Sequence, residues 1–294
     1  MLLPFDYVRA RSREEAVDLA IRAGAGGRFL AGGTDLLVRI HDRQLRPQVL
    51  IDLKGIVGIQ AVSPRAGGGL VVGAATPLNR LISHEAVRAG YGLLAEAAHT
   101  VGSVQIRNRA SLGGNISNAS PAADTAPALL LYEAEIVTWG QAGERRIPIS
   151  EFFKGPGATA LSAGEFVFQV ELPALKERSF GTYLKLGRTG AVDLSIVSVA
   201  ALALEGGEVR LALGAVAPTP VRVREAEAIL RNRKDQHAIR EAAAAARRFA
   251  EPISDIRASK EYRLEMTEVL SARAIEQALR GLEAGAGARR GDRP

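Results

Sequence analysis

The chain contains no cysteine. This absence excludes disulfides, thiol nucleophiles and any zinc or iron–sulfur centre that cysteines of this chain would ligate. The four histidines, His41, His84, His99 and His237, are scattered without the spacing of a metal-binding motif. His84 is followed by Glu85, but the second histidine that a metalloprotease helix requires is missing. We therefore expect surface or packing roles for the histidines and no metal site.

Long apolar runs and aromatic clusters are also scarce. Aromatic residues make up 5% of the chain, and apolar runs such as 196–204 are much shorter than the roughly 20 residues of a membrane span. Near the start, Pro4 and Asp6 stand where a signal peptide would carry its apolar stretch. We expect a soluble, cytoplasmic protein without a membrane span.

The formal net charge is +6, which raises the question of nucleic-acid binding. Most basic residues are arginines dispersed among glutamates in predicted helices, as in 222–233 and 238–251, and no basic cluster is interleaved with aromatic residues. The pattern is typical of a solvated surface and would also suit an anionic ligand. We do not expect a nucleic-acid partner.

With 294 residues, 47% of them hydrophobic and 24% charged, the chain is long enough for two or three globular domains. Ser12 and Glu15 form a capping box before a helix that Gly24 ends. From about residue 55 the pattern becomes rich in strands. The strands predicted in the first 173 residues are 29–31, 48–53, 59–62, 70–74, 134–139, 146–149 and 166–172, and the helices are 14–23, 35–40, 78–83, 91–99 and 127–132. Thr76 and Pro77 are the predicted cap and first residue of the helix 78–83.

In the last third of the chain, the predicted strands come first and the predicted helices follow, unlike the mixed order of the first 173 residues. The predicted strands are 183–186, 196–204 and 209–215, and the predicted helices are 222–232, 237–250 and 259–282. Such blocks predict a separate α+β domain. We expect two subdomains, 1–55 and 56–173, then a C-terminal domain, 178–283, and a disordered tail, 284–294.

Two glycine pairs stand out. Leu30–Leu36 (LAGGTDL) places Gly32 and Gly33 between a predicted strand and a predicted helix, and Arg107–Asp124 (RNRASLGGNISNASPAAD) carries the second pair among small polar residues. Small residues let the backbone approach a ligand and present its N–H groups, and a strand-to-helix turn suits a phosphate. The two segments predict that two phosphates of one dinucleotide are held from two sides.

Known nucleotide and hydrolase motifs are absent. No P-loop and no GxSxG occur, and Gly24, Gly26 and Gly27 give no GxGxxG because Phe29 holds the third glycine position. A Rossmann fold is further disfavoured because the glycines do not open a βαβ unit with a parallel sheet. Asp35 and Asp124 could form a catalytic pair, but small-residue loops favour ligand hydroxyls and ring N–H groups as their partners. The chemistry is therefore expected from a cofactor, and no catalytic residue is assigned.

Three stretches resemble one known family. LAGGTDLLV (30–38), VQIRNRASLGGNISNASPAADTAPALL (104–130) and YLKLGR (183–188) are similar to the two FAD loops and the basic C-terminal strand of the flavoprotein (medium) subunits of molybdenum hydroxylases, which include xanthine dehydrogenase and aerobic carbon monoxide dehydrogenase. The resemblance covers about residues 1–282. It implies an α+β fold, with a two-subdomain FAD-binding domain of the vanillyl-alcohol-oxidase (PCMH) type and a C-terminal α+β domain with a small antiparallel sheet and three helices.

The resemblance also implies a set of FAD-binding residues. The first loop would line the pyrophosphate and adenosine, the second loop would bind the pyrophosphate and ribityl chain, and Val167 would contact the adenine through its backbone. Asp124 would hold ribityl hydroxyls, Lys185 would favour the reduced, anionic flavin, and Leu194 would lie near the ring face. The full set is Phe29, Leu30, Ala31, Gly32, Gly33, Thr34, Asp35, Leu36, Val101, Ser111, Gly113, Gly114, Asn115, Asn118, Asp124, Val167, Lys185 and Leu194.

Structural alternatives exist for several of these residues. Gly113 and Gly114 could form only a tight turn, Lys185 could be a surface lysine on an edge strand, and Asn118 and Ser120 could cap the helix near Pro127. No histidine lies inside either glycine loop. We therefore expect non-covalent FAD.

The family resemblance implies an electron-transfer role in an oxidoreductase complex. Electrons would pass from molybdopterin in a large partner, through [2Fe-2S] centres in a small partner, to this FAD and then to NAD, quinone or oxygen. The family expectation is a dimer of heterotrimers. Two alternatives stay open, a non-catalytic assembly subunit that has lost flavin and a stand-alone flavin oxidase. The organic substrate and the terminal acceptor cannot be read from the sequence.

Overall fold

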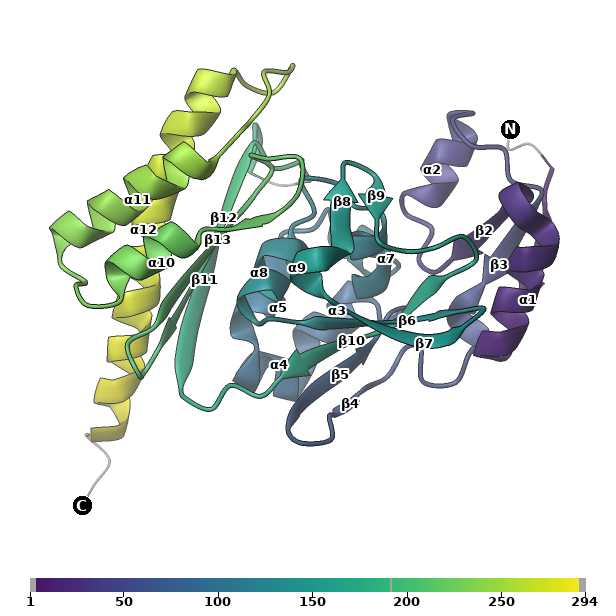
Figure 1. Cartoon of the computed structure of the whole chain (residues 1–294), viewed down its shortest axis with the longest axis horizontal. Helices are drawn as coiled ribbons and strands as arrows, with labels where there is room; N and C mark the ends of the chain where they lie inside the picture. Colours follow the sequence, from purple (N-terminus) through teal and green to yellow (C-terminus); the bar gives the residue numbers. More distant parts are fainter. Residues whose placement is uncertain (1–3, 191, 291–294) are drawn as a thin grey trace. The chain divides into compact units, whose positions relative to one another are not determined.

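The computed structural model describes residues 4–190 and 192–290, and their helices and strands form the predicted α+β fold (Figure 1). The chain divides into two units, each built from three segments. Unit 1 comprises Met1–His84, Ser103–Ala119 and Glu133–Ala174, and unit 2 comprises Glu85–Gly102, Ser120–Tyr132 and Leu175–Pro294. The glycine-rich segment 107–124 therefore crosses from unit 1 to unit 2 after Ala119.

Unit 1 begins with a three-stranded parallel sheet in the order β1-β3-β2. Its strands are β1 (Asp6–Arg9), β2 (Gly27–Leu30) and β3 (Val49–Asp52), and its helices are α1 (Arg13–Ala23), η1 (Gly24–Gly26), α2 (Leu36–His41) and η2 (Leu53–Gly55). The predicted capping of α1 is confirmed, because the Glu15 N–H donates to the Ser12 hydroxyl at 3.1 Å. Gly24 follows the helix with a φ of +52°, a conformation that favours glycine.

A βαβ unit lies within this sheet. Strand β2 is followed by Gly32 and Gly33, then by α2 and by β3, and β3 pairs with β2 in parallel. Gly24–Gly26 form a 3-10 turn between α1 and β2, so they do not open that unit. Gly27 is the first residue of β2, so Gly24, Gly26 and Gly27 all lie before the turn of that unit. The Gly32-Gly33 pair lies at the strand-to-helix turn, as the sequence predicted.

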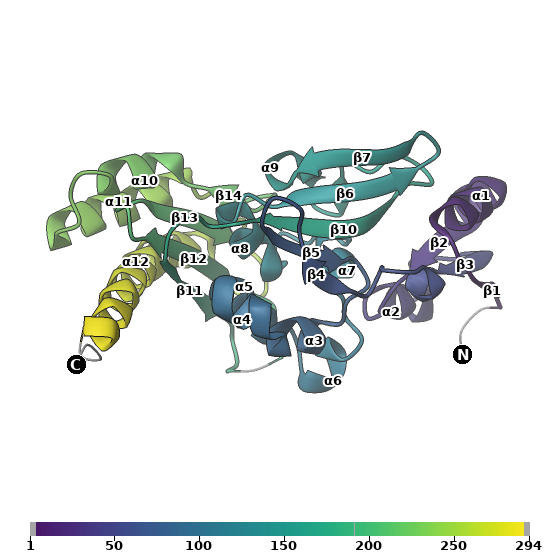
Figure 2. The same cartoon turned by 90° about the horizontal axis from the view of Figure 1, so that it is seen from below.

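The second part of unit 1 is a five-stranded antiparallel sheet in the order β4-β5-β10-β6-β7 (Figure 2). Its strands are β4 (Val62–Pro64), β5 (Gly69–Gly73), β6 (Glu135–Gly140), β7 (Gly143–Pro148) and β10 (Phe166–Pro173), and the other elements of unit 1 are α3 (Leu78–Ser83), α6 (Val104–Arg107), α7 (Leu112–Ser117), α9 (Ile149–Phe152), β8 (Phe153–Gly155) and β9 (Ala158–Thr159). The Arg13 guanidinium of α1 lies 3.9 Å from the ring centroid of Trp139 on β6. This stacking joins α1 to the larger sheet.

Two predictions for this region were wrong in detail. The strand expected at 59–62 begins only at Val62, because the preceding residues form turns whose N–H groups bond locally, as the Ala61 N–H does with the Gly58 carbonyl. Pro77 is the N-cap of α3 rather than its first residue. The Thr76 hydroxyl does not cap the helix, because it donates to the Ala61 carbonyl instead.

Unit 2 is built on a four-stranded antiparallel sheet in the order β11-β12-β13-β14. Its strands are β11 (Ser179–Leu186), β12 (Val197–Leu204), β13 (Val209–Gly214) and β14 (Val221–Arg222), and its helices are α4 (Glu85–Gly90), α5 (Gly92–His99), α8 (Thr125–Leu131), α10 (Arg224–Leu230), α11 (Gln236–Phe249) and α12 (Lys260–Arg290). Helix α12 therefore includes 284–290, the first part of the segment predicted as a disordered tail. The rest of that segment, 291–294, lies outside the described residues.

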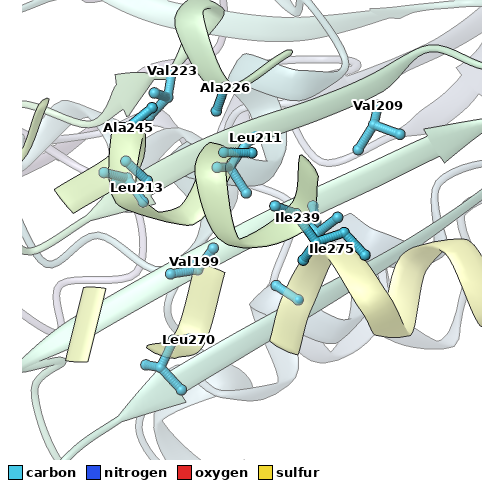
Figure 3. Close-up of a cluster of buried hydrophobic side chains, with 14 of the residues drawn as sticks. Val199, Val209, Leu211, Leu213, Val223, Ala226, Ile239, Ala245, Leu270 and Ile275 are labelled. Atoms are coloured by element: carbon cyan, nitrogen blue, oxygen red, sulfur yellow. The ribbon is translucent and has the colours of Figure 1, made fainter. Parts of the chain in front are cut away.

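Every residue of β12 is buried, so helices cover both faces of the sheet. On one face Val199 packs with Leu211 and Leu213 of β13, Ile239 of α11 and Ile275 of α12 (Figure 3). α5 and α8 contact the strands within the same unit. Burial of this apolar surface stabilises the unit, at about 25 cal/mol per Å². The predicted small antiparallel sheet with three C-terminal helices is confirmed.

Candidate functional site

The first glycine pair needs glycine at both positions, for two different reasons. At Gly32 a Cβ atom would lie 2.0 Å from the backbone carbonyl oxygen of Arg109, which no side chain can occupy. Gly33 has a φ of +78°, a region that L-residues adopt at a cost of about 1–2 kcal/mol. The sequence predicted close approach to a ligand, but at Gly32 the close approach is to the second loop.

The backbone N–H groups of the first loop are available to a ligand. Within the described residues, 4–190 and 192–290, the four consecutive N–H groups of Gly32–Asp35 have no hydrogen-bond acceptor. The Leu37 N–H, which follows, donates to the Gly33 carbonyl at 3.0 Å and starts the helix. A run of consecutive N–H groups without acceptors at a strand-to-helix turn suits an anion, phosphate above all.

The backbone N–H groups of the second glycine pair donate to acceptors within the protein itself. Ser111 caps α7, since its hydroxyl oxygen accepts the Gly114 N–H at 3.2 Å, and the serine is 2% exposed. The Gly113 N–H donates to the Ala74 carbonyl at 2.8 Å, and a Cβ at Gly113 would lie 2.4 Å from the Ala74 Cβ. Here the close approach joins α7 to the end of β5. This second pair therefore has a packing role.

The structure brings the two predicted loops together inside unit 1. Besides the contact of Gly32 with Arg109, the Asn118 side-chain amide donates to one Asp35 carboxylate oxygen at 3.0 Å. The Thr34 hydroxyl donates to the other carboxylate oxygen at 3.3 Å. Asp35 is thus one link between the two loops.

Several predicted residues of unit 1 have visible structural roles. The rings of Phe29 and Phe166 pack with their centroids 5.1 Å apart. Leu30 is buried in a small core against which Leu36 packs. Val167 is buried on β10, directly before a one-residue shift in the pairing of β10 with β6. Ligand contact by these residues, and by Ala31 and the half-buried Asn115, stays a prediction.

In unit 2, Asp124 collects three donors around one buried carboxylate. Its Oδ1 accepts the hydroxyls of Tyr183 and Ser195, both at 2.7 Å, and its Oδ2 accepts the Lys185 ammonium at 2.8 Å. Lys185 also donates to the Thr100 carbonyl at 3.1 Å. The carboxylate is therefore held in a fixed orientation with its charge paired.

This arrangement sets the chemistry of the Asp124 group. Burial, together with the negative charge of Asp124, raises the pKa of the Tyr183 hydroxyl well above its usual value, so the tyrosine remains a neutral donor. Lys185 is 13% exposed at its side chain. An ammonium has three N–H groups, and two are used within the described residues. One donor of Lys185 and one acceptor position on Asp124 Oδ2 are therefore left for a ligand.

Sequence reasoning missed Tyr183 and Ser195. A signal existed for Tyr183, because residues two apart on a strand share a face, and Tyr183 and Lys185 are both on β11. No local pattern marked Ser195, which reaches Asp124 from 71 residues away. Of the other predicted residues, Val101 follows α5 and donates its N–H to the Ala98 carbonyl at 3.2 Å, and Leu194 is 59% exposed.

Metal-ligand clusters and membrane-spanning helices are both absent from the described part of the chain. Between residues 4 and 290, with 191 left aside, no three His, Asp or Glu side chains are grouped as a metal site would require. In the same stretch, no helix is both long and apolar enough to cross a bilayer.

Two family models together match nearly the whole chain. Residues 3–175 match the FAD-binding domain in molybdopterin dehydrogenase, and residues 182–278 match the carbon monoxide dehydrogenase flavoprotein C-terminal domain. The gap between the two matches, 176–181, includes the first residues of β11.

Similar proteins are subunits of dehydrogenases that are named for different substrates. The chain is 30% identical to the xanthine dehydrogenase FAD-binding subunit of Escherichia coli O157:H7, over 93% of this chain and 95% of that protein. It is 32% identical to the glyceraldehyde dehydrogenase medium chain of Sulfolobus acidocaldarius, over 93% and 98%. Among solved structures, a chain of the carbon monoxide dehydrogenase of Hydrogenophaga pseudoflava superposes with a TM-score of 0.91 at 33% identity, over 95% of this chain and 98% of that one.

Proposed function

Since the chain belongs to the FAD-binding (medium) subunits of the xanthine and carbon monoxide dehydrogenase family, we propose that it holds FAD non-covalently and relays electrons through it. The observation that carries the proposal is the first glycine loop. Its four consecutive N–H groups, those of Gly32–Asp35, have no acceptor among the described residues, and they lie at a strand-to-helix turn. FAD supplies an acceptor for two electrons that can pass them on singly.

The residues present fit the cofactor's pyrophosphate. Four N–H groups in a run match the several oxygens of two phosphates, and none of the four has an acceptor among the described residues. The side-chain amide of Asn118 donates at 3.0 Å to Asp35, the last residue of this N–H run, and so ties the loop to the second segment. We assign the pyrophosphate to this loop, and we assign to Arg109 and Asn118, on either side of α7, the role of holding the loop in place.

Within unit 2, Lys185 has the chemistry that the polar edge of a flavin ring requires. Its ammonium is held by Asp124 and the Thr100 carbonyl and retains one N–H. A fixed positive charge favours the reduced, anionic flavin. Asp124 retains one acceptor position, which suits a single ribityl hydroxyl. These two assignments stay predictions, as do those of Val167 and Leu194.

The chain's partners and its electron acceptor are proposals of the same kind. We propose a large molybdopterin subunit and a small subunit with [2Fe-2S] centres, paired as a dimer of heterotrimers, with NAD, quinone or oxygen as the final acceptor. A xanthine dehydrogenase subunit and a glyceraldehyde dehydrogenase subunit are about equally similar to this chain, at 30% and 32% identity. This supports the view that the partner, not this chain, selects the organic substrate. A cytoplasmic location stays a prediction.

The first experiment measures FAD retention. The purified chain is incubated with FAD, passed through gel filtration and examined by visible absorbance and flavin fluorescence. We expect flavin absorbance to elute with the protein and its fluorescence to be quenched or shifted. No retention, even with molybdenum- and iron-containing partners present, would favour an assembly subunit without flavin. Retention without any co-purifying molybdenum or iron would favour a stand-alone flavin oxidase.

A matched pair of glycine variants tests the loop itself. Gly33 and Gly67 have almost the same φ, +78° and +79°, but Gly67 lies in the turn before β5, with nothing within 4 Å of the position that a Cβ atom would take. Gly33→Ala should weaken FAD binding at least about tenfold because it reshapes the N–H run, while Gly67→Ala carries similar backbone strain of about 1–2 kcal/mol. Equal FAD affinity in the two variants would contradict the assignment of the pyrophosphate to this loop.

A further inference from the structure

Two arginines of the C-terminal segment hold the backbone at the start of β12. The Arg257 guanidinium donates to the Ser195 carbonyl at 3.2 Å, and the Arg263 guanidinium donates to the next carbonyl, that of Ile196, also at 3.2 Å. Ser195 is fully buried and Ile196 is 4% exposed. Two consecutive carbonyls are therefore fixed by this one segment, at the point where the exposed stretch containing Leu194 enters the sheet.

One carboxylate holds both arginines. Asp255 accepts the Arg263 guanidinium at 2.6 Å on Oδ1 and the Arg257 guanidinium at 2.7 Å and 3.1 Å on Oδ2. Its Oδ1 also accepts the Arg257 backbone N–H at 2.8 Å. All four acceptor positions of the carboxylate are engaged, so the two guanidinium groups have little freedom to move.

The side chain of Ser195 transmits this fixation to Asp124. Its hydroxyl donates to Asp124 Oδ1 at 2.7 Å, beside the Tyr183 hydroxyl, while Lys185 occupies Oδ2. The contacts are continuous. Asp255 holds Arg257, which donates to the Ser195 carbonyl, and the Ser195 hydroxyl donates to Asp124, which accepts the Lys185 ammonium. Arg263 supports the same stretch at the Ile196 carbonyl. All of these residues belong to unit 2.

We propose that Asp255 and Ser195 are positioning residues that set the charge presented by Lys185 to the flavin, an inference that rests on the proposed function. Each hydroxyl donor on Asp124 Oδ1 neutralises part of the carboxylate's charge. When a donor is lost, more of that charge falls on Lys185, and less positive potential remains for the reduced flavin. The flavin then becomes harder to reduce, although neither Asp255 nor Ser195 is assigned a contact with it.

The chain offers a matched control for each positioning residue. Glu227 in unit 2 also accepts two arginines, Arg222 at 2.6 Å and Arg224 at 3.3 Å, and a backbone N–H, that of Leu211 at 3.1 Å. None of these contacts reaches Asp124. For Ser195 the control is Ser271 on α12, a fully buried serine whose hydroxyl has no partner among the described residues.

The test compares flavin potentials in the full chain with FAD bound. The variants are Ser195→Ala, Ser195→Thr, Asp255→Asn, Glu227→Gln and Ser271→Ala, each equilibrated with redox dyes at a fixed potential. We expect Ser195→Ala and Asp255→Asn to lower the ratio of reduced to oxidised flavin about tenfold, or about 30 mV for a two-electron couple. Ser195→Thr keeps the hydroxyl and should restore most of the wild-type ratio, while the two control variants should leave it unchanged.

A second readout needs no flavin. Amine labelling of the flavin-free chain, followed by mass spectrometry, reports how tightly Lys185 is held, with Lys176 as an internal reference. We expect Ser195→Ala and Asp255→Asn to lower the relative labelling of Lys185 roughly threefold, because more of the Asp124 charge then falls on the Lys185 ammonium and holds it more firmly. The controls should leave the relative labelling at the wild-type value.

The outcomes separate this inference from the proposed function. Unchanged potentials and unchanged Lys185 labelling in Ser195→Ala and Asp255→Asn would overturn the positioning role. If Ser195→Ala and Asp255→Asn lower the melting temperature as much as the controls do, but change neither the flavin potential nor the Lys185 labelling, their role is structural only. If the wild-type chain retains no FAD, the proposed function fails and the inference about the flavin falls with it. In that case the labelling still decides whether Asp255 and Ser195 hold Lys185.

Discussion

The two glycine pairs look alike in sequence and are used differently in the structure. Each pair lies at the start of a short helix, α2 or α7, and each has a hydroxyl residue close to it. In the first pair the backbone N–H groups lack acceptors among the described residues, whereas at Gly113 and Gly114 the N–H groups are bonded to Ala74 and Ser111. The comparison teaches that a glycine pair indicates a close approach, but only the surrounding acceptors decide whether the approach is to a ligand or to the protein.

The largest effect is expected at Gly32. An alanine there would place its Cβ 2.0 Å from the Arg109 carbonyl oxygen, so the two loops would have to separate. We expect Gly32→Ala to lower the free energy of unfolding by roughly 3 kcal/mol and to abolish FAD retention. Urea unfolding and flavin titration measure the two quantities. Wild-type stability in this variant would refute the contact between the loops.

Gly113 should separate stability from binding. Gly113→Ala sets a Cβ 2.4 Å from the Ala74 Cβ, and we expect a loss of roughly 1–3 kcal/mol in unfolding free energy. FAD affinity should stay close to wild type at temperatures where the variant is folded, in contrast to Gly32→Ala. The added Cβ would also lie 2.8 Å from the Ala74 Cα and carbonyl oxygen, so Ala74→Gly should restore only part of the stability in a double variant. Wild-type stability of Gly113→Ala would contradict the packing role.

The Asn115→Leu variant tests whether a side chain of α7 contacts FAD in addition to the packing role of this helix. The amide is half-buried on α7, one residue after the glycine pair. We expect Asn115→Leu to fold normally and to bind FAD about tenfold more weakly, because a polar group is replaced by an apolar one beside phosphate. Flavin titration measures the change. Full FAD occupancy at normal affinity would restrict the cofactor contacts of unit 1 to the first loop.

The smallest effect is expected at Gly114. Its backbone is helical, and an added Cβ would meet only the Ser111 hydroxyl, at 3.0 Å. Alanine gains roughly 0.5–1 kcal/mol in helix propensity, which offsets the crowding of the cap. Gly114→Ala should therefore change the free energy of unfolding by less than about 1 kcal/mol, in thermal melts read beside Gly113→Ala. A loss as large as that of Gly113→Ala would mean that both glycines of the pair are packed.

Much of the fold could be predicted because local signals agreed with the tertiary structure. Helix α11 was expected at 237–250 and lies at Gln236–Phe249, where Asp235 caps it through two backbone N–H groups at 2.9 Å. Strand β11 was expected to begin at Tyr183 but begins at Ser179, because pairing with β12 extends it where its own residues show no apolar pattern. Sheet partners decide such boundaries.

The site could be predicted only as a set of segments. The sequence identified both loops, Asp124 and Lys185, but it could not show that Asp124 receives donors from residues 59, 61 and 71 positions further along. Likewise, the acceptor of the Gly113 N–H is the carbonyl of Ala74, far away in sequence. Whether a backbone N–H has an acceptor depends on residues that are distant in sequence. The two glycine patterns are similar, so the sequence could not tell the two loops apart.

The most direct test of the central claim is the response of individual backbone amides to FAD. Amide hydrogen exchange, followed by NMR on the labelled chain with and without FAD, reports each N–H separately. We predict that the amides of Gly32–Asp35 exchange rapidly in the free chain and become protected with FAD, while those of Gly113 and Gly114 are protected in both. Protection that appears only at Gly113 and Gly114, with Gly32–Asp35 unchanged, would contradict the account.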